Sequence, residues 1–350
     1  MRSLRLSLDA EALRDNWRAI RSRSDAANVM AIVKSRAYGH GLRFAAKALC
    51  DVADGFGVVE SADAAVLRKT GVVSPIMLLS GAFDAEDMTR ACEMRLWLAA
   101  HSDEQIKRIV EAPSDSDLTV FVKVNTGMNR LGFSPQNAAA VMDCLARAPS
   151  VSRVGLMSHF ACADSPDRDS VENALSLLRP LREKAAMVSL GNSAALLFQG
   201  DMKDDWGRAG ISLYGSSPAP ALKSRDELGL RAVMTLYGEI ISVKNLRAGD
   251  AVGYGGEWQA SRDTRIGIVS CGYGDGYPRS NNLWAQIGEK KAAVIGRVSM
   301  EMLALNLTDC DNANVGTEVV LWGESPNIDD IAAAAGRISY ELFTAIGGRE

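Results

Sequence analysis

The chain has 350 residues, of which 47% are hydrophobic and 23% charged, and its formal net charge is −4. This length exceeds what one small core spans, so we expect two domains, or one large α/β domain with an appendage. The lack of a basic run argues against a nucleic-acid partner. The lack of an apolar N-terminal segment or a membrane-length apolar run predicts a cytoplasmic protein.

The N-terminal residues predict a helix, a short buried strand and a second helix. Asp9 fits as the N-cap of a helix over 8–22, where apolar residues recur at helical spacing. Met30–Val33 has the length and β-branching of a buried strand, and it stops at Lys34 before a loop rich in glycine. A helix over 43–53 follows.

From there, short apolar runs alternate with stretches of helical periodicity. Seven further strands are expected at Gly55–Val59, Pro75–Leu79, Arg95–Ala99, Leu118–Val124, Arg153–Met157, Met187–Leu190 and Ile211–Tyr214. Strand–helix alternation implies parallel strands with covering helices, and eight such units fit a (β/α)8 barrel, here over residues 1–225. The alternative, a doubly wound open sheet, normally has a Gly-rich phosphate turn after its first strand, where this chain has Lys34-Ser35-Arg36.

The sequence pattern changes after about Pro220. Alternating, β-branched segments separated by turns rich in Gly, Asn and Asp predict a mainly antiparallel β domain over residues 226–350. Its strands are expected at 232–243, 265–270, 291–298, 302–307 and 318–322, with short helices at 328–335 and 339–345.

Chemistry in a parallel barrel belongs to the residues that follow each strand on its C-terminal side. Amines, guanidinium groups, hydroxyls and an imidazole stand there: Lys34, Tyr38, Lys123, Arg130, Ser158, His159, Asn192 and Ser193, while Arg208 and Gly210 stand directly before the eighth expected strand, which starts at Ile211. Their placement on one rim predicts an anionic ligand, and Ser193 beside exposed backbone amides is suited to phosphate.

Each of these residues also has a simpler structural interpretation. Taken alone, Lys34 is better explained as a surface lysine that ends a strand, although a desolvated amine there would suit a Schiff base. His159 could be a satisfied core histidine, Arg130 and Arg208 could form surface ion pairs, and Ser193 could simply cap a helix.

A series of motifs runs along both predicted domains. In the barrel they are Leu8-Asp9-Ala10-Glu11-Ala12-Leu13 with Asn16, Val33-Lys34-Ser35-Arg36-Ala37-Tyr38-Gly39-His40-Gly41, Lys123 with Thr126-Gly127-Met128-Asn129-Arg130-Leu131-Gly132, Ser158-His159-Phe160, Asn192-Ser193-Ala194-Ala195 and Arg208-Ala209-Gly210-Ile211. In the second domain they are Gly272-Tyr273-Gly274-Asp275-Gly276-Tyr277-Pro278-Arg279, Gly296-Arg297-Val298-Ser299-Met300 and Arg337-Ile338-Ser339-Tyr340-Glu341. In number and order, over nearly the whole chain, this series resembles that of the fold-type III, pyridoxal-phosphate-dependent alanine racemases.

The resemblance implies a role for each motif. Lys34 would hold pyridoxal 5'-phosphate through a Schiff base and act as one of two bases, and Tyr273 of a partner subunit would be the other. The phosphate would be bound by the hydroxyls and amides of Tyr38, Ser193, Gly210, Ile211 and Tyr340. Asn192 would also bind the cofactor, His159 would pack beside its ring, and Arg208 would face its pyridine nitrogen.

Three further residues are implied by the same resemblance. Arg130 and Met300 would serve the substrate side, Arg130 through the phenolic oxygen of the cofactor and Met300 through a backbone amide to the substrate carboxylate. Lys123 matches a lysine that is often carbamylated and steadies that arginine. Since Lys34 and Tyr273 fall in different domains, a head-to-tail homodimer with two shared sites is expected.

The expected reaction is the interconversion of L- and D-alanine, for peptidoglycan or in alanine catabolism. Inverting the centre needs one base on each face, because a single base would return the proton to the side it left. Ser299 and Glu301 depart from the cysteine and aspartate common in the family, which leaves a serine or broad-specificity racemase as the alternative.

Other classes are less favoured. No long insertion or decarboxylase-type cysteine motif is found, and a non-catalytic cofactor-binding barrel would lack the second domain. Six scattered cysteines without a Cys-x-x-Cys pair, and three histidines without metal-pair spacing, predict reduced thiols and no metal site.

Overall fold

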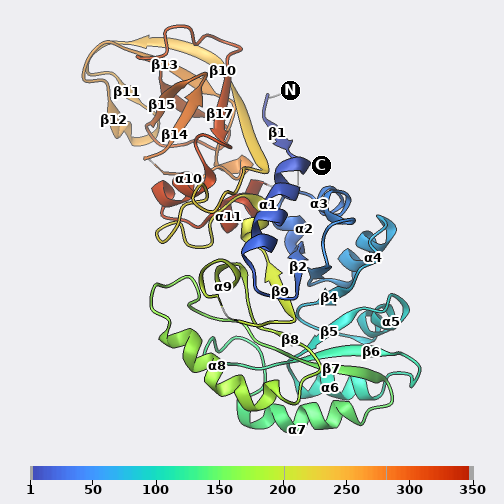
Figure 1. Ribbon diagram of the computed structural model, residues 1–350. Helices are drawn as coiled ribbons and strands as arrows, with labels where there is room; N and C mark the ends of the chain where they lie inside the picture. Colours follow the sequence, from blue (N-terminus) through green and yellow to red (C-terminus); the bar gives the residue numbers. More distant parts are fainter. Residues whose placement is uncertain (1–2, 201, 281, 347–350) are drawn as a thin grey trace.

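The structure, a computed structural model, describes residues 3–200, 202–280 and 282–346. It has two parts, a parallel barrel wrapped by helices and a C-terminal, mainly antiparallel β domain (Figure 1). Both architectures were predicted from the sequence and are confirmed. Helices α10 (Ile328–Ala335) and α11 (Ser339–Ile346) lie between the two parts.

The barrel has eight parallel strands. They are β2 (Asn28–Ile32), β3 (Gly55–Val58), β4 (Ile76–Leu78), β5 (Trp97–Ala100), β6 (Leu118–Lys123), β7 (Val151–Met157), β8 (Val188–Ser189) and β9 (Trp206–Ala209). Pairing runs from β8 in descending order to β2 and then to β9. Two backbone hydrogen bonds close the seam between β8 and β9, from Asp205 to Val188 at 3.0 Å and from Arg208 to Gly191 at 2.9 Å. All the carboxyl ends therefore share one rim.

The eighth strand lies elsewhere than the sequence predicted. Ile211–Tyr214 was expected to be a strand, but it forms a 3₁₀ turn, η1, and the strand is the preceding β9. The prediction was wrong because it looked for an apolar run, whereas β9 carries a buried arginine, Arg208. That arginine is accommodated because the barrel offers its guanidinium three backbone carbonyls.

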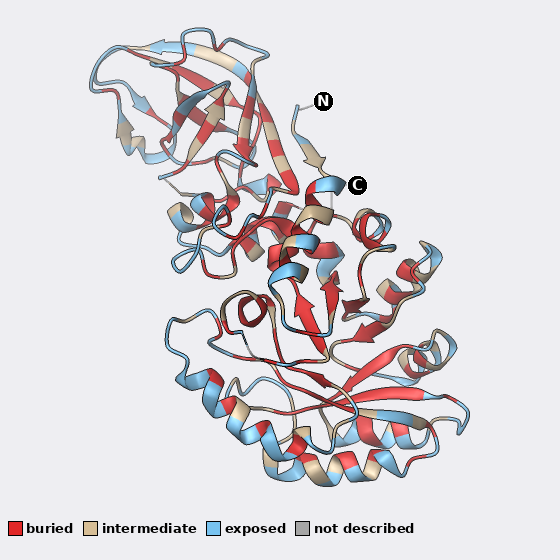
Figure 2. Ribbon diagram, in the orientation of Figure 1, coloured by how far each residue is buried: buried red, intermediate tan, exposed pale blue. Residues whose placement is uncertain are grey.

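Helices cover the outside of the barrel and turn their buried faces to the strands (Figure 2). They are α1 (Ala10–Arg23), α3 (Leu42–Leu49), α4 (Ser61–Lys69), α5 (Ala85–Glu93), α6 (Asp103–Val110), α7 (Pro135–Ala146), α8 (Asp169–Arg182) and α9 (Ser193–Phe198). Asp9 caps α1 as expected, accepting from the Ala12 amide at 3.0 Å. The short helix α9 was considered only as a helix that Ser193 would cap, whereas its N-cap is Asn192 and Ser193 is its first residue.

The C-terminal domain contains a closed ring of six strands. They are β10 (Met234–Leu246), β13 (Thr264–Val269), β14 (Trp284–Ile287), β15 (Lys290–Ile295), β16 (Leu303–Asn306) and β17 (Glu318–Trp322), and the ring closes because β17 pairs with β10. A small hairpin, β11 (Ala251–Val252) with β12 (Trp258–Gln259), stands apart. Tyr277 and Trp322 stack inside the domain, with ring centroids 5.8 Å apart.

The start of the chain belongs to the C-terminal sheet, because β1 (Arg5–Leu8) pairs with β10 in antiparallel register. The chain then enters the barrel through α1, where buried Asn16 donates to the carbonyls of Leu213 and Arg231 at 3.0 and 2.9 Å. One hydrophobic core runs through both parts. Barrel and β domain therefore pack as one body, and α11 can reach the barrel rim.

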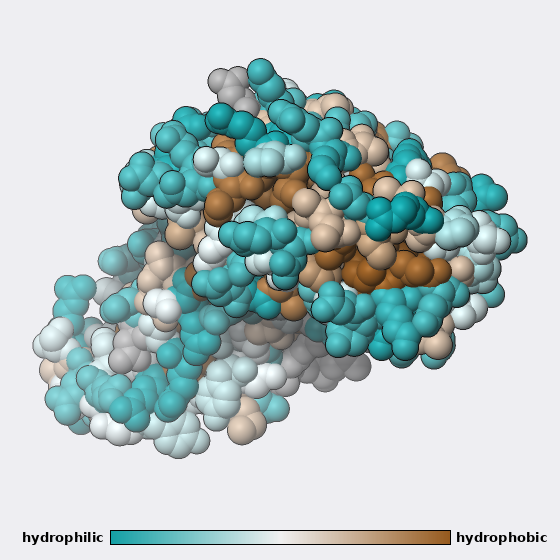
Figure 3. Space-filling model, turned by 90° about the horizontal axis from the view of Figure 1, so that it is seen from below, coloured by the Kyte–Doolittle hydropathy of each residue, from teal (hydrophilic) through white to brown (hydrophobic). Residues whose placement is uncertain are grey.

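The outer surface is mainly polar where it is seen from below the barrel, with apolar residues showing in bounded patches between hydrophilic ones (Figure 3). In the described part of the chain, no helix combines the length and the apolar character needed to cross a membrane.

Candidate active site

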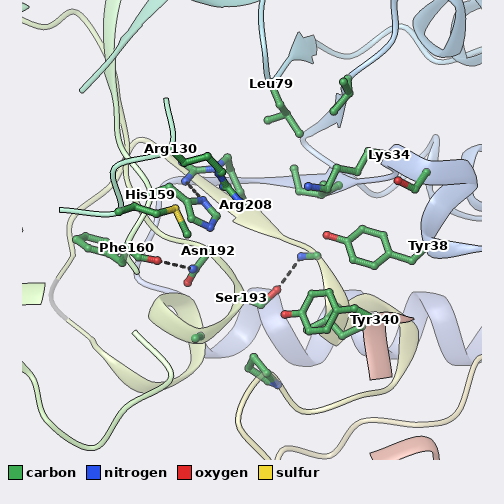
Figure 4. A pocket seen from close by; sticks show the side chains of 18 of the residues that line it. Lys34, Tyr38, Leu79, Arg130, His159, Phe160, Asn192, Ser193, Arg208 and Tyr340 are labelled. Atoms are coloured by element: carbon green, nitrogen blue, oxygen red, sulfur yellow. Dashed lines mark hydrogen bonds between the residues drawn. The ribbon is translucent and has the colours of Figure 1, made fainter. Parts of the chain in front are cut away.

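The carboxyl-end rim of the barrel encloses a pocket of about 670 Å³ (Figure 4). Eleven residues that the sequence analysis singled out line it: Lys34, Tyr38, Lys123, Arg130, His159, Asn192, Ser193, Arg208, Gly210, Ile211 and Tyr340. The lining contains four lysine or arginine side chains and two carboxylates, those of Asp164 and Glu341. This excess of positive charge suits an anionic ligand.

Lys34 begins a turn of unusual backbone conformation, α2 (Lys34–Tyr38). The four residues from Ser35 to Tyr38 all have positive φ, between 52° and 55°, which makes this a left-handed turn. Each non-glycine residue in that conformation costs about 1–2 kcal/mol, and such strain clusters at functional sites. The sequence predicted only a loop here.

The turn directs Lys34 and Tyr38 into the same pocket from its two ends (Figure 4). Burial, followed by the positive charges of Arg130 and Arg208, lowers the pKa of the Lys34 amine. A lowered pKa increases the fraction of neutral, nucleophilic amine at physiological pH.

Several hydroxyls and backbone amides gather around Gly210 in the pocket. The Gly210 amide donates to Ser193 Oγ at 2.7 Å, and a Cβ added at Gly210 would lie 2.7 Å from Tyr38 Oη and 3.6 Å from Ser193 Oγ. Only glycine leaves this space open. Tyr340, on α11, adds a third hydroxyl to the pocket, and burial raises its pKa to about 12, so that it stays a donor. We call Tyr38, Ser193, Gly210, Ile211 and Tyr340 the hydroxyl cup.

Asn192 caps α9, the helix that carries Ser193 of the hydroxyl cup. Its side chain accepts from the Ala195 amide at 3.1 Å as N-cap and donates to the Phe160 carbonyl at 3.4 Å. Ser193 is therefore the first helical residue, next to unpaired backbone amides that suit an anion.

Arg208 is anchored at its two terminal nitrogens. Nη1 donates to the carbonyl and hydroxyl of Ser189, both at 2.7 Å, and Nη2 donates to the carbonyls of Ser158 and Leu190 at 2.7 and 3.0 Å. Within the described residues, Nε–H has no such partner and is left for the pocket. Burial lowers the pKa of Arg208 to about 10, so the guanidinium remains mostly protonated at neutral pH.

His159 lies against the guanidinium, with Nδ1 3.4 Å from Arg208 Nη2. Because that arginine can only donate, Nδ1 is the acceptor and the ring proton sits on Nε2. Burial and then Arg208 lower the pKa of His159 to about 3, so the imidazole is neutral.

Lys123 and Arg130 line the remaining wall. Burial and then the charges of Arg208, Arg130 and Lys34 lower the pKa of Lys123 to about 8. Arg130 is exposed and makes no hydrogen bond or ion pair with the described residues. The cations Lys123 and Arg130 therefore line the same wall, and Arg130 has no acidic partner among the described residues.

Tyr273 and Met300 do not line this pocket. They lie side by side in the C-terminal domain, where the Tyr273 amide donates to the Ser299 carbonyl at 3.0 Å and the Gly274 amide donates to the Met300 carbonyl at 2.8 Å. Both side chains are exposed, by 43% and 58%. A Cβ at Gly272 would lie 2.3 Å from the Ser299 oxygen, so glycine is what lets these two loops touch.

Comparison with known proteins accounts for both halves of the chain. The models for "Alanine racemase, N-terminal domain" and "Alanine racemase, C-terminal domain" match residues 8–218 and 233–350. The chain belongs to the alanine racemase family. It is 41% identical to the catabolic alanine racemase of Klebsiella aerogenes, over 98% of this chain and 96% of that protein. It is also 41% identical to the alanine racemase of Nitrosospira multiformis, over 99% of this chain and 98% of that protein.

Solved structures of the family have the same fold. The biosynthetic alanine racemase of Pseudomonas aeruginosa matches with a TM-score of 0.95 at 40% identity, covering all of this chain and 98% of that one. The alanine racemase of Acinetobacter baumannii matches with a TM-score of 0.94 at 35% identity and the same coverage, 100% and 98%.

Sequence analysis missed three buried residues beside the family motifs. Tyr214 stacks on Tyr38 with ring centroids 4.9 Å apart, and Ser189 accepts from Arg208. Asp204, four residues before Arg208, accepts backbone hydrogen bonds from the end of β8. Two consecutive aspartates directly before a strand were the available signal for Asp204, whereas nothing local marked Ser189 or Tyr214.

Proposed function

We propose that this member of the alanine racemase family interconverts L- and D-alanine with pyridoxal 5'-phosphate as cofactor. The observation that carries the proposal is that Lys34, the hydroxyl cup and Arg208 open into one positively charged pocket. An amine, a phosphate site and a donor for a ring nitrogen are the three features that this cofactor requires.

The residues present fit the cofactor by their chemistry. The cup offers neutral hydroxyl donors and the Ile211 amide around the open space at Gly210, whose own amide donates to Ser193 Oγ, and such donors suit a phosphate. Lys34 and Tyr38 stand at the two ends of one turn, so the amine and the phosphate contacts are held in a fixed relation. When bound, the cofactor supplies the electron sink that allows the Cα proton of alanine to leave.

The chain's own residues then supply positions and protons. The Lys34 amine binds the cofactor and exchanges the Cα proton on one face, helped by its lowered pKa. Arg208 would offer Nε–H to the pyridine nitrogen of the bound cofactor without readily giving the proton up, since the guanidinium stays protonated at neutral pH. We infer that the ring nitrogen stays unprotonated, which favours simple proton return over transamination.

The second base in our proposal is Tyr273 of a partner subunit in a homodimer. Within one chain, Tyr273 and Met300 are outside the pocket and exposed, and Tyr254 and Met302 nearby in the C-terminal domain are exposed by 67% and 44%. Docking of this apolar surface over the barrel rim of a second copy would bury it and bring a hydroxyl to the face opposite Lys34. Met300 would then offer its backbone amide to the substrate carboxylate.

We also propose that Lys123 is carbamylated. The reaction with CO₂ needs a neutral amine, and the pKa of about 8 supplies one more readily than an ordinary lysine does. The product is an anion beside Arg130, which relieves the repulsion between the two cations and holds Arg130 for the phenolic oxygen of the cofactor. Carbon-13 NMR after addition of labelled bicarbonate should show one carbamate signal, absent in Lys123→Ala.

The deciding experiment is incubation of the cofactor-loaded protein with L-alanine, L-serine and a panel of other L-amino acids, followed by chiral separation. We expect D-alanine as the main product and none from Lys34→Ala. Cofactor-loaded protein that forms no D-alanine would overturn the proposed reaction, and a faster reaction with serine would redirect it to the alternative substrate.

Subunit mixing tests the shared site. Lys34→Ala and Tyr273→Phe homodimers should each be nearly inactive, and a mixture should regain activity, because a hybrid dimer contains one intact site. No recovery, despite subunit exchange shown by mass spectrometry, would contradict the proposal. The division of the chain at residue 225 and the cytoplasmic location stay predictions from the sequence.

A further inference from the structure

Asp204 is a buried carboxylate outside the pocket that the proposed chemistry does not use. It is 2% exposed and precedes β9. One oxygen, Oδ2, accepts from the backbone amides of Leu190 and Gly191 at 2.8 and 2.6 Å. The other, Oδ1, is buried without a hydrogen-bond partner among the described residues. Burial of a carboxylate is costly unless hydrogen bonds and opposite charges offset it.

The hydrogen bonds of Asp204 lead to Arg208 through a single peptide group. The peptide between Leu190 and Gly191 gives its N–H to Asp204 Oδ2 at 2.6 Å, and its carbonyl accepts from Arg208 Nη2 at 3.0 Å. An anion at the N–H end polarises a peptide and makes its oxygen a stronger acceptor. The Arg208 amide also donates to the Gly191 carbonyl at 2.9 Å, so the segment that follows β8 is bound both by Asp204 and by Arg208.

We propose that Asp204 is a positioning residue for Arg208: through the Leu190–Gly191 peptide it holds the guanidinium with Nε–H directed into the pocket and keeps it charged at alkaline pH. The inference rests on the proposed function, because it concerns the donor that meets the ring nitrogen of the cofactor. Asp204 touches neither substrate nor cofactor, and it acts only through Arg208.

Charge balance around Arg208 explains why such a residue is needed. Burial lowers the pKa of Arg208, and the other cations of the pocket, Lys34, Lys123 and Arg130, surround the same cavity. Asp204 is the group whose charge raises that pKa again. Burial raises the pKa of Asp204 to about 6, while the amides of Gly191 and Leu190, and then the charges of Arg208 and of Arg182 on α8, favour the ionised carboxylate.

The test compares two ligands that differ only at the ring nitrogen. Cofactor-free protein is titrated with pyridoxal 5'-phosphate and with its 1-deaza analogue, in which CH replaces that nitrogen, from pH 7 to pH 11. Phosphate and amine contacts are common to both, so the ratio of their Kd values reports on the Arg208 donor. In the wild type we expect a preference for the natural cofactor that disappears with the deprotonation of Arg208, near pH 10.

Asp204→Asn keeps an acceptor oxygen and removes the charge. We expect the pH at which the preference disappears to fall by about one unit, the effect of a nearby opposite charge. Asp205→Asn is the matched control, because Asp205 also accepts a backbone amide of β8, from Val188 at 2.8 Å, but does not act on Arg208. The same shift in both variants, or in neither, would overturn the inference.

If Asp204→Asn does not fold, a measurement on the cofactor-free wild type tests the same coupling between Asp204 and Arg208. The Arg208 Nε–H proton resonance, assigned by its loss in Arg208→Lys, should titrate with Asp204 near pH 6. His159, with a pKa of about 3, does not titrate in that range. Lys123, with a pKa of about 8, titrates at higher pH, so the range is limited to pH 5 to 7, and a resonance that stays constant there would refute the coupling. Failure of the proposed function looks different, since the protein would then not bind the cofactor or would form no D-alanine.

Discussion

His40 allows a direct test of how the left-handed turn is held. The imidazole is 1% exposed, and its Nδ1 contacts the carbonyls of Ala37 and Tyr38 at 3.1 and 3.0 Å. Carbonyls only accept, so Nδ1 carries the proton. The ring stacks on Tyr214 at 4.5 Å and meets the edge of Phe343 at 4.7 Å. His40 therefore connects the turn to the barrel and to α11.

The perturbation that isolates the hydrogen bond is His40→Phe, which keeps an aromatic ring of similar volume. Four left-handed residues store about 4–8 kcal/mol, at roughly 1–2 kcal/mol each. The Ala37 carbonyl keeps the His40 amide as a donor at 3.0 Å, but the Tyr38 carbonyl loses its partner. A buried carbonyl left without a donor costs about 1–3 kcal/mol.

Urea unfolding of the cofactor-free protein measures this cost. We expect His40→Phe to be less stable than the wild type by about 1–3 kcal/mol, with faster amide exchange at residues 35–39. The affinity for pyridoxal 5'-phosphate should fall as well, because Tyr38 leaves the cup. His40→Asn, which keeps a donor at the position of Nδ1 but loses the ring, should retain slow exchange in the turn.

The reasoning is refuted if His40→Phe proves as stable as the wild type or more stable. Phenylalanine avoids the burial of Nε2, which has no partner among the described residues, and it adds apolar surface. Without an important hydrogen bond, this substitution should therefore stabilise the protein.

Three other predictions address the cup, the buried histidines and the junction between the domains. Gly210→Ala places a methyl 2.7 Å from a tyrosine hydroxyl and should weaken cofactor binding at least tenfold in a fluorescence titration, about 1.4 kcal/mol; an unchanged Kd would show that the cup is not the phosphate site. Burial lowers the pKa of His40 to about 4 and of His159 to about 3, so the folded state resists their protonation. Their contribution to the free energy of unfolding is fully present above pH 6.5. It should be lost as the pH drops from 6.5 to 4, by about 3 kcal/mol per histidine, which urea titrations across this range would detect. Buried Arg225→Met should cost about 1–3 kcal/mol by the same method, whereas the control Arg5→Met, at an exposed ion pair, should cost under about 0.5 kcal/mol.

Sequence periodicity was sufficient for the elements whose burial follows from their own residues. The strand over β6 could be predicted because most of its residues are apolar, and the helix over α1 because Asp9 caps it and its apolar residues recur at helical spacing. The position of Lys34 at the end of the first barrel strand followed from the apolar run before it. Eight such units in order were enough to place the chemistry on one rim.

Contacts between distant segments decided the rest. β9 was missed because the burial of its arginine depends on the carbonyls of Ser158, Ser189 and Leu190, which lie at the ends of β7 and β8 and which no local pattern reports. The left-handed turn after Lys34 is locally unfavourable and depends on His40 and on the aromatic rings packed around it. β1 could be assigned to the C-terminal sheet only through its pairing with β10.

The sequence by itself thus determined the barrel, the β domain and the identity of the residues on the rim, because hydrophobic periodicity and motif order are local properties. Tertiary structure alone decided that the turn after Lys34 is left-handed, and that Asp204 reaches Arg208 through a peptide group. Both depend on which loops the fold brings into contact, and hydrogen bonds between residues far apart in the chain leave no trace in its periodicity.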